Sequence, residues 1–441
     1  MILISNTNLL GYHFSNGMPM LPFYHRSLIA KMNGITYVSE TMTYLPLRRR
    51  LLNLMKSWKI IRLRRKKILI FSSTLFNVKN DDKFFNYIHS YYYNLYKDDT
   101  LLIEDGDGNY RWRTMDSVPN LSSINSTIVF ISNIIAQLFN KTRPLHGLVY
   151  DAFTEEFSQY LSKSQVSRDD YFVKVYSWLL DKLFAYVKPK CVIVNCASYG
   201  HNMAVVTYIA KKRGIKVIEP QHGVTWKGPA YNASDQIAES SVFAECLPDA
   251  LFTFGNFWGE CVCWKYEKYV VGSPYLNEYA SIRKENNTGY DFLVISQPMA
   301  GNIGDAKNNF VRELARHFPG KKILFRIHPS EDFEEQKNIF KEENITISNS
   351  TTVLYDDFNN SNYILGWYSN CLYEALAFGK NPIIVDTPRT RELMAQNVGI
   401  WIKNPSEITE EKLQRQCQVD YKQFWAGDFE GRVKKYIDNI L

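Results

Sequence analysis

From residue 68 onward, short apolar runs alternate with longer amphipathic stretches. The apolar runs predict strands at Ile68–Ser73, Thr100–Glu104, Cys191–Cys196, Lys216–Glu219, Leu251–Phe254 and Tyr269–Gly272. Helical stretches separate them, and the clearest is MAVVTYIAKKRG, with cations in its last turn and Gly214 at its end. Strands that alternate with helices predict a mostly parallel sheet covered on both faces.

A second α/β series follows a polar stretch, residues 276–289, where we expect a linker. Its strands are predicted at Phe292–Ser296, Lys322–Ile327, Tyr363–Leu365, Pro382–Asp386 and Gly399–Ile402. We therefore expect an α/β fold of two Rossmann-like domains, 1–275 and 290–441, that face each other across a cleft. First strands near 35–39 would add to the first domain, and the last helix can return to it.

Composition agrees with a folded chain. At 441 residues, 45% hydrophobic and 22% charged, the chain is neither disordered nor a single small domain. Seven Cys without a secretory leader favour a reducing compartment. The longest uncharged stretch, 117–140, places Ile124, Ile128, Ile131, Ile135 and Leu138 at helical spacing, which predicts an amphipathic helix and no transmembrane span.

The positive charge is concentrated in one segment. The formal net charge is +7, and Arg48 to Lys67 holds ten Lys or Arg and no acid, so the rest is net negative. Leu, Ile and Trp58 lie between the cations, a mixture that suits a helix on an anionic bilayer. A solvated helix packed on its domain is the alternative. Without a reading motif, we expect no nucleic-acid partner and a cytoplasmic protein, peripheral on the inner face of the membrane.

One strand of the second series ends at a candidate phosphate site. Strand KKILFRI runs into His328 and Pro329, and Arg326 and His328 are expected on one face because they are two residues apart. Arg can bind a phosphate with two hydrogen bonds, and His can share a proton near neutral pH. Pro329 fixes the turn beside the nucleotide. A capped strand whose His bonds a loop is the alternative.

A second motif in this series strengthens the prediction. Strand YILGW is followed by Ser369 and Asn370, which can cap a helix whose N-terminus attracts anions. Glu374, one turn further, can accept hydrogen bonds from ribose hydroxyls. The alternative is a plain helix cap with a solvated Glu. Together with Arg326 and His328, these residues predict a nucleotide-phosphate pocket.

Two motifs in the first series are candidates for a catalytic base. Glu104 and Asp105 end a strand before the turn GDG, where a carboxylate can deprotonate a hydroxyl, or where the residues simply form a surface turn. Gln221, His222 and Gly223 directly follow strand IKVI, at a position where polar residues beside a glycine are expected to contact a ligand. A structural histidine is the alternative there.

Several common enzyme signatures are absent. The sequence has no G-x-G-x-x-G after a strand, no phosphate-binding P-loop, no G-x-S-x-G and no H-E-x-x-H. Dinucleotide oxidoreductases, P-loop ATPases, serine hydrolases and zinc proteases are therefore disfavoured. Cys261-Val-Cys263 lacks a second ligand pair at zinc spacing, so no metal site is expected.

Three motifs, QHG, R-x-H-P and SNCLYEALAFG, together resemble bacterial GT-B glycosyltransferases of capsule and lipopolysaccharide synthesis, Kdo-type transferases among them. The stretches IEPQHGVTWKGPAY, LPDALFTFGNFWGE and VVGSP look like those of capsular polysaccharide glycosyltransferases. The resemblance extends over residues 191–386, and the first ~65 residues are outside it. It implies a GT-B-like fold, a nucleotide-sugar co-substrate without a cofactor, and metal-independent, inverting transfer.

Glu104-Asp105-Gly106 and His328-Pro329 also resemble the paired motifs of bacterial sialyltransferases and polysialyltransferases. That resemblance implies Asp105 as the base, Glu104 second, and His328 as the partner of the CMP phosphate. Where that family has a pair of serines, this chain has Ser369 and an asparagine. The two resemblances thus disagree over the base, Asp105 or His222.

The sequence predicts an enzyme that moves a sugar from a nucleotide donor to a hydroxyl of a growing bacterial surface glycan, free or lipid-linked. The preferred donor is a CMP-activated sialic acid or Kdo-type sugar. A CDP-polyol phosphotransferase and a nucleotide-sugar epimerase are the alternatives within the same fold. A membrane-associated scaffold is the alternative without enzyme activity.

Overall fold

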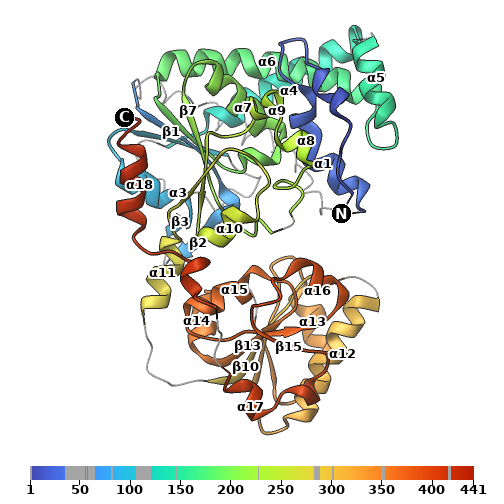
Figure 1. Cartoon of the computed structure of the whole chain (residues 1–441), viewed down its shortest axis with the longest axis vertical. Helices are drawn as coiled ribbons and strands as arrows, with labels where there is room; N and C mark the ends of the chain where they lie inside the picture. The colour runs from blue at the N-terminus through green and yellow to red at the C-terminus, as the bar shows by residue number, and fades with distance from the viewer. Residues whose placement is uncertain are drawn as a thin grey trace. The chain divides into compact units, whose positions relative to one another are not determined.

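The computed structural model describes residues 2–34, 55, 57, 65–80, 83–105, 121–145, 148–226, 228–282, 289–299, 302–348, 353–415 and 419–441. The chain forms two compact units (Figure 1). Unit 1 comprises Met1–Phe254, Trp258–Val271 and Asp428–Leu441, and unit 2 comprises Gly255–Phe257 and Gly272–Gly427. The strands expected near 35–39 and most of the basic segment 48–67 lie outside the described residues.

Unit 1 contains a seven-stranded parallel sheet. The strands, from one edge to the other, are β5 (Leu121–Ser122), β4 (Thr100–Asp105), β1 (Ile68–Ser73), β6 (Cys191–Val194), β7 (Lys216–Pro220), β8 (Ala250–Thr253) and β9 (Glu267–Val270). A short antiparallel hairpin, β2 (Asn77–Asn80) and β3 (Lys83–Asn86), follows β1. Without the hairpin, the strand order is that of a Rossmann fold with one strand added at the end.

Alternating side chains of this sheet enter two separate cores. Leu69 and Phe71 of β1 join one cluster, and Ile68 and Ile70 join the other. Such a strand is apolar on both faces because helices cover both. The first core is covered by α1 (Met20–Met32), α4 (Ile124–Thr142), α5 (Leu148–Glu156), α6 (Lys163–Val187), α7 (His201–Lys212) and the short helices α8 (Asp235–Ala238) and α9 (Ser241–Ala244). The second is covered by α3 (His89–Leu95) and α18 (Phe429–Ile437).

Unit 2 contains a six-stranded parallel sheet in the Rossmann order. Its strands are β12 (Ile345–Ser348), β11 (Ile323–Arg326), β10 (Tyr290–Ile295), β13 (Ser361–Gly366), β14 (Ile383–Val385) and β15 (Ile400–Ile402). Its helices are α11 (Pro274–Ser281), α12 (Asn302–His317), α13 (Phe333–Ile339), α14 (Leu354–Asn359), α15 (Asn370–Ala377), α16 (Pro388–Leu393) and α17 (Glu410–Leu413). Helix α12 packs its apolar side on one face, while α14 and α15 contact β13.

The boundary between the units differs from the expected linker. Unit 2 begins again at Gly272, and helix α11 starts at Pro274, so residues 276–281 form a helix of unit 2 and not a linker. Pro at the first helical position and buried Leu276 explain the helix. The rest of the expected linker, 283–288, lies outside the described residues. Helix α10 (Asn256–Glu260) also spans a boundary.

The last helix, α18, belongs to unit 1. Phe429, Val433 and Ile437 are buried in the second core of that unit. Tyr436 donates a hydrogen bond to Glu267 at 2.9 Å, and Tyr96 donates one to Asp438 at 2.7 Å. Unit 1 is therefore assembled from chain segments that lie before and after unit 2.

Candidate functional site

In unit 1, polar side chains gather at the carboxyl ends of β6 and β7. The strand order reverses between β1 and β6, and ligands of such sheets bind beside that point. The turn after β6 is tightly built: Gly200 has φ +82°, and a Cβ there would lie 2.7 Å from the carbonyl oxygen of Pro22. This close approach requires glycine and fixes the turn against α1.

His222, just beyond β7, is the centre of this group. Its Nε2 lies 3.0 Å from the hydroxyl of Tyr199 and 3.5 Å from Sγ of Cys196. Its ring packs against Phe76, with centroids 5.3 Å apart. Arg26 of α1 places its guanidinium 4.1 Å from the centre of the Tyr199 ring, a cation–π contact. The turn that carries Cys196 and Tyr199 and the residue Phe76 thus contact the half-buried imidazole, and Arg26 packs on Tyr199.

A buried carboxylate fixes the turn that carries Tyr199. Glu219 of β7 is fully buried and accepts hydrogen bonds from the amide of Ser198 at 2.8 Å, from its hydroxyl at 2.6 Å and from the Tyr231 hydroxyl at 3.0 Å. Burial raises the pKa of Glu219 to about 7, against the opposing effect of these hydrogen bonds. Glu219 therefore connects β7, which carries His222, to the neighbouring Tyr199.

The imidazole of His222 is neutral at pH 7. Burial, followed by the positive charge of Arg26, lowers its pKa to about 4. Nearby His89 is fully buried, and desolvation together with His222 lowers its pKa to about 3. A neutral imidazole has one nitrogen that can accept a proton, which is the property that a general base requires.

Two of the other expected residues of unit 1, Glu104 and Gln221, are buried and hydrogen-bonded. Glu104 is 1% exposed and accepts a hydrogen bond from Asn77, so it lies beneath the sheet edge instead of facing a substrate. Gln221 is also 1% exposed and connects the Gly223 carbonyl to the Phe254 amide, so it holds the loop together. Asp105 ends β4, but its side chain and the turn GDG lie outside the described residues.

Gly223 leaves open space. A Cβ added there meets no atom within 4 Å, so nothing in the fold requires glycine at this position by packing. Its predicted role in letting a ligand approach the backbone stays a prediction.

In unit 2, a buried ion pair supports the turn after β11. Lys307 of α12 and Glu331 pair at 2.5 Å, with side chains 2% and 8% exposed, and Ser296 also donates to Glu331. The other oxygen of Glu331 accepts from the His328 amide at 2.8 Å. Burial alone would raise the pKa of Glu331, but the hydrogen bonds from Lys307, His328 and Ser296 outweigh it and leave the pKa lowered.

The imidazole of His328 itself is exposed above this ion pair. Its Nδ1 accepts from the Ser330 amide at 3.2 Å and lies 2.8 Å from the Ser330 hydroxyl. The neutral ring therefore carries its proton on Nε2, which becomes a hydrogen-bond donor. Partial desolvation of the ring, together with the positive charge of Lys307, lowers the pKa of His328 in spite of Glu331.

Arg326 has an ion-pair partner that the sequence did not predict. Its guanidinium forms an ion pair with Asp357 of α14, and both side chains are 11% exposed. Ile327 is buried in the same core as Phe325, so the alternation of side chains continues one residue beyond β11, as expected if Arg326 and His328 lie on one face. Arg326 pairs with Asp357 and His328 contacts Ser330, and the expectation that the two residues bind one phosphate stays a prediction.

The start of α15 forms as predicted, and Glu374 is partly buried beside the helix cap. Ser369 is the N-cap, with its hydroxyl 3.3 Å from the Cys371 amide. Asn370 donates to Glu374 at 2.6 Å, and burial raises the pKa of Glu374 to about 7. Gln297, after β10, accepts from the Tyr368 amide at 2.9 Å, which joins the two strand ends where the order of this sheet reverses.

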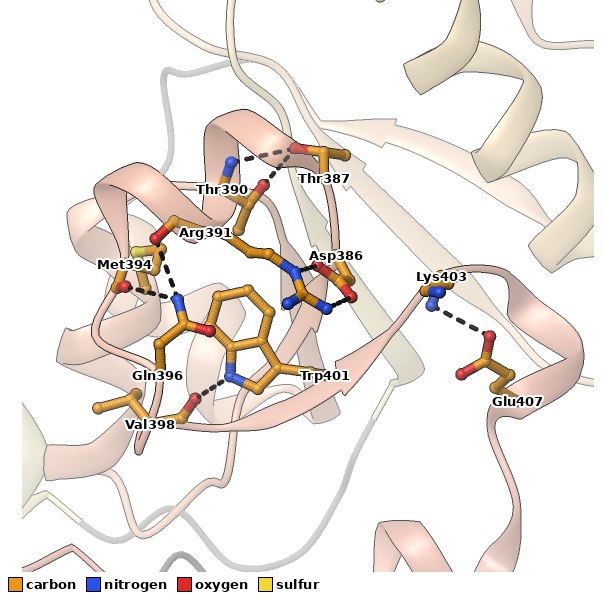
Figure 2. Close-up of polar contacts among 10 residues, drawn as sticks. All are labelled: Asp386, Thr387, Thr390, Arg391, Met394, Gln396, Val398, Trp401, Lys403 and Glu407. Atoms are coloured by element: carbon orange, nitrogen blue, oxygen red, sulfur yellow. Dashed lines mark hydrogen bonds and ion pairs between the residues drawn. The ribbon is translucent and has the colours of Figure 1, made fainter.

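The neighbouring strand end of unit 2 is closed by structural contacts (Figure 2). Asp386, after β14, accepts two hydrogen bonds from Arg391 at 2.5 and 2.6 Å, and this contact lowers the pKa of Asp386. Thr387 and Thr390 bond each other, and Trp401 donates to the Val398 carbonyl. Asp386 is therefore a structural carboxylate.

Within the described ranges, no group of three or more His, Cys, Asp or Glu side chains is placed to hold a metal ion. No helix in the part of the chain that the structure covers is both long and apolar enough to cross a bilayer.

No known family model matches the sequence, and no curated protein sequence matches it. Solved structures do match. UDP-GlcNAc 2-epimerase from Methanocaldococcus jannaschii is 14% identical with a TM-score of 0.47, covering 84% of this chain and 99% of that one. The structure of S. aureus MnaA with UDP is 15% identical with a TM-score of 0.47, covering 85% of this chain and 98% of that one. Acinetobacter baumannii MurG is 9% identical with a TM-score of 0.38, covering 79% of this chain and 88% of that one. TM-scores below 0.5 support no conclusion about activity, and the fold assignment rests on strand order.

The residues that hold the two histidines were not found from the sequence. Arg26, Tyr199 and Glu219 in unit 1, and Lys307 and Glu331 in unit 2, act across elements distant in the chain. A local signal existed only for Glu219, an acid at the end of the apolar run IKVIEP. Charged residues in apolar runs are rarely buried without a partner.

Proposed function

We propose that this protein acts on a nucleotide-activated sugar and transfers the sugar to an acceptor hydroxyl, with His222 as the general base. The observation that carries the proposal is the neutral imidazole of His222, fixed at the carboxyl edge of unit 1 by Tyr199 and flanked by Arg26. A fixed acceptor of protons beside a cation suits deprotonation of a hydroxyl near an anionic substrate.

Through Arg26, the pKa of the proposed base, His222, depends on whether an anionic substrate is bound. In the ligand-free protein, this cation helps to hold the pKa of His222 at about 4, below the best range for a base at neutral pH. A phosphate or carboxylate beside Arg26 offsets its charge and moves the pKa of His222 upward. The base then becomes stronger when an anionic substrate is bound.

Unit 2 holds the nucleotide in this proposal. The Nε2 proton of exposed His328 and the N-terminus of α15 at Ser369 can both donate hydrogen bonds to phosphate oxygens. Charge develops on the leaving phosphate during transfer, so such donors stabilise the transition state. Arg326 and Glu374 are given no ligand role, because both have buried partners.

The proposal also concerns which nucleotide activates the donor sugar. A CMP-activated sugar rests on the His328-Pro329 turn and on Asp105, whereas a base at His222 does not require CMP. Melting-temperature shifts with CMP, UDP, GDP and CDP distinguish these donors, because the bound nucleotide stabilises the folded state. If no nucleotide raises the melting temperature, the scaffold alternative replaces the enzyme.

The decisive experiment compares His222→Gln with Asp105→Ala, and uses His317→Gln in α12 as the matched control. Loss of the base lowers kcat by about 100-fold or more, while the melting temperature and nucleotide binding remain. We expect this for His222→Gln only. Full turnover of His222→Gln with an inactive Asp105→Ala would move the base to Asp105.

Product analysis decides the reaction itself. A glycosidic bond to the acceptor is the expected product. An epimerised donor formed without acceptor would replace transfer by epimerisation, the reaction named for the M. jannaschii structure. A phosphodiester would indicate polyol-phosphate transfer.

A further inference from the structure

Helix α4 exposes several large apolar side chains, although part of its buried side is polar. Its buried residues include Asn125, Thr127 and Ser132, whereas four large apolar side chains are exposed: Ile131 37%, Ile134 40%, Leu138 61% and Phe139 46%. A helix that only covered the core of its own domain would turn its apolar side inward. The outer side of α4 is therefore suited to contact an apolar environment.

The exposed apolar side chains of α4 continue onto α6, which packs beside it (Figure 1). Phe139 and Tyr171 are in ring contact at 5.5 Å, and Trp178, two turns further along α6, is 59% exposed. Six of the nine large hydrophobic residues exposed in the described part of the chain belong to this region. They are Met55, Ile131, Ile134, Leu138, Phe139 and Trp178, which we call the α4–α6 face.

Positive charge accompanies the α4–α6 face. Helix α4 contains no acid and ends in Lys141, and exposed Lys182 lies 5.9 Å from the centre of the Trp178 ring. The sequence Arg48–Lys67 holds ten Lys or Arg and no acid, and one of its described residues, buried Ser57, bonds Thr127 of α4 at 2.9 Å. Lys67 pairs with Asp99, so at least one of the ten cations is already engaged within the domain.

We propose that the α4–α6 face docks on an anionic lipid bilayer, with its apolar side chains in the interface and the basic segment near the headgroups. Two such positive faces repel each other, which disfavours a second copy of this chain as the occupant. Trp and aliphatic residues beside Lys and Arg are the composition that binds anionic bilayer surfaces. This inference is independent of the proposed function.

Vesicle flotation of the full chain tests the proposal. The probes are vesicles of phosphatidylcholine alone and of phosphatidylcholine with phosphatidylglycerol. The variant Ile134→Gln/Leu138→Gln/Trp178→Gln removes the apolar contacts, and Arg48→Gln/Arg49→Gln/Arg50→Gln removes charge. Ile282→Gln, which alters a side chain 54% exposed in unit 2, is the matched control. Circular dichroism confirms that each variant is folded.

We expect wild-type protein and Ile282→Gln to float with the anionic vesicles and much less with the neutral ones. Each triple variant should bind at least about tenfold more weakly. Wild-type binding by the apolar variant, or no flotation of the wild-type protein, overturns the proposal. So does a wild-type dimer that the apolar variant dissociates while neither protein floats, because a second copy then covers the face.

Discussion

The two sheet edges hold their histidines in opposite ways. In unit 1, the imidazole of His222 is itself fixed, by the Tyr199 hydroxyl and by packing on Phe76. In unit 2, the buried pair of Lys307 and Glu331 fixes the main chain of His328 and leaves the imidazole exposed. A fixed ring suits proton transfer at a defined position, whereas a fixed turn with an exposed ring suits a ligand that arrives and completes the site.

The largest expected effect is a loss of folding stability when the buried ion pair of unit 2 is broken. Lys307→Met leaves Glu331 buried without its cation, and breaking such a pair costs about 3–5 kcal/mol. Chemical denaturation measures this loss in the free energy of unfolding. The matched control is Lys321→Met, which removes an exposed pair with Asp291 and should cost about 1 kcal/mol or less. Equal losses in the two variants would mean that the buried pair does not support unit 2.

In unit 1, the contribution of Glu219 to the free energy of unfolding should instead depend on pH. Because the folded-state pKa of Glu219 is raised from 4.5 to about 7, the folded protein keeps a proton that the unfolded chain releases. Stability therefore falls as pH rises from about 4.5 to about 7, by about 3 kcal/mol at about 1.4 kcal/mol per pKa unit. Glu219→Gln cannot titrate, so its free energy of unfolding should change less over this range. An unaltered slope would assign the pH dependence to other groups.

The smallest effect concerns the ring of His222. Tyr199→Phe keeps the aromatic ring under Arg26 and removes one hydrogen bond, at a cost of about 1 kcal/mol. Nitrogen NMR of the imidazole should show a changed tautomer balance, and kcat should fall by about fivefold at that energy. Tyr176→Phe removes the bond to Asn125 and should leave the His222 signals unchanged. Identical spectra for Tyr199→Phe and wild type would show that Tyr199 does not orient the base.

The regular strands were predictable because their apolar runs are continuous. The run ILIFSS became β1 with the predicted bounds, and the strands at 191, 216 and 383 differ by one or two residues at an end. Strand β5 was missed because it has only two residues, and β12 because the alternating ITIS is short and partly polar. Which side of a helix is buried can depend on tertiary partners that a sequence pattern does not contain, as the partly polar buried side of α4 shows.

The sites were predictable only as positions at sheet edges. His222 and His328 follow strands β7 and β11 as the sequence indicated. The partners of these strand-end residues could not be derived: Arg326 pairs with Asp357 of helix α14, and Tyr199 reaches His222 from another crossover. Such pairings are set by how distant elements pack, so local spacing could not reveal the ion pair of Arg326 with Asp357.

The place of helix α18 in unit 1 has a consequence for biosynthesis. The ribosome synthesises Phe429–Ile437 after all of unit 2, yet these residues complete a core whose strand β1 was made hundreds of residues earlier. The first unit therefore cannot finish folding during its own translation. Unit 2 can close first on the nascent chain, so premature termination before α18 leaves the unit that emerged earliest as the one most exposed to proteolysis.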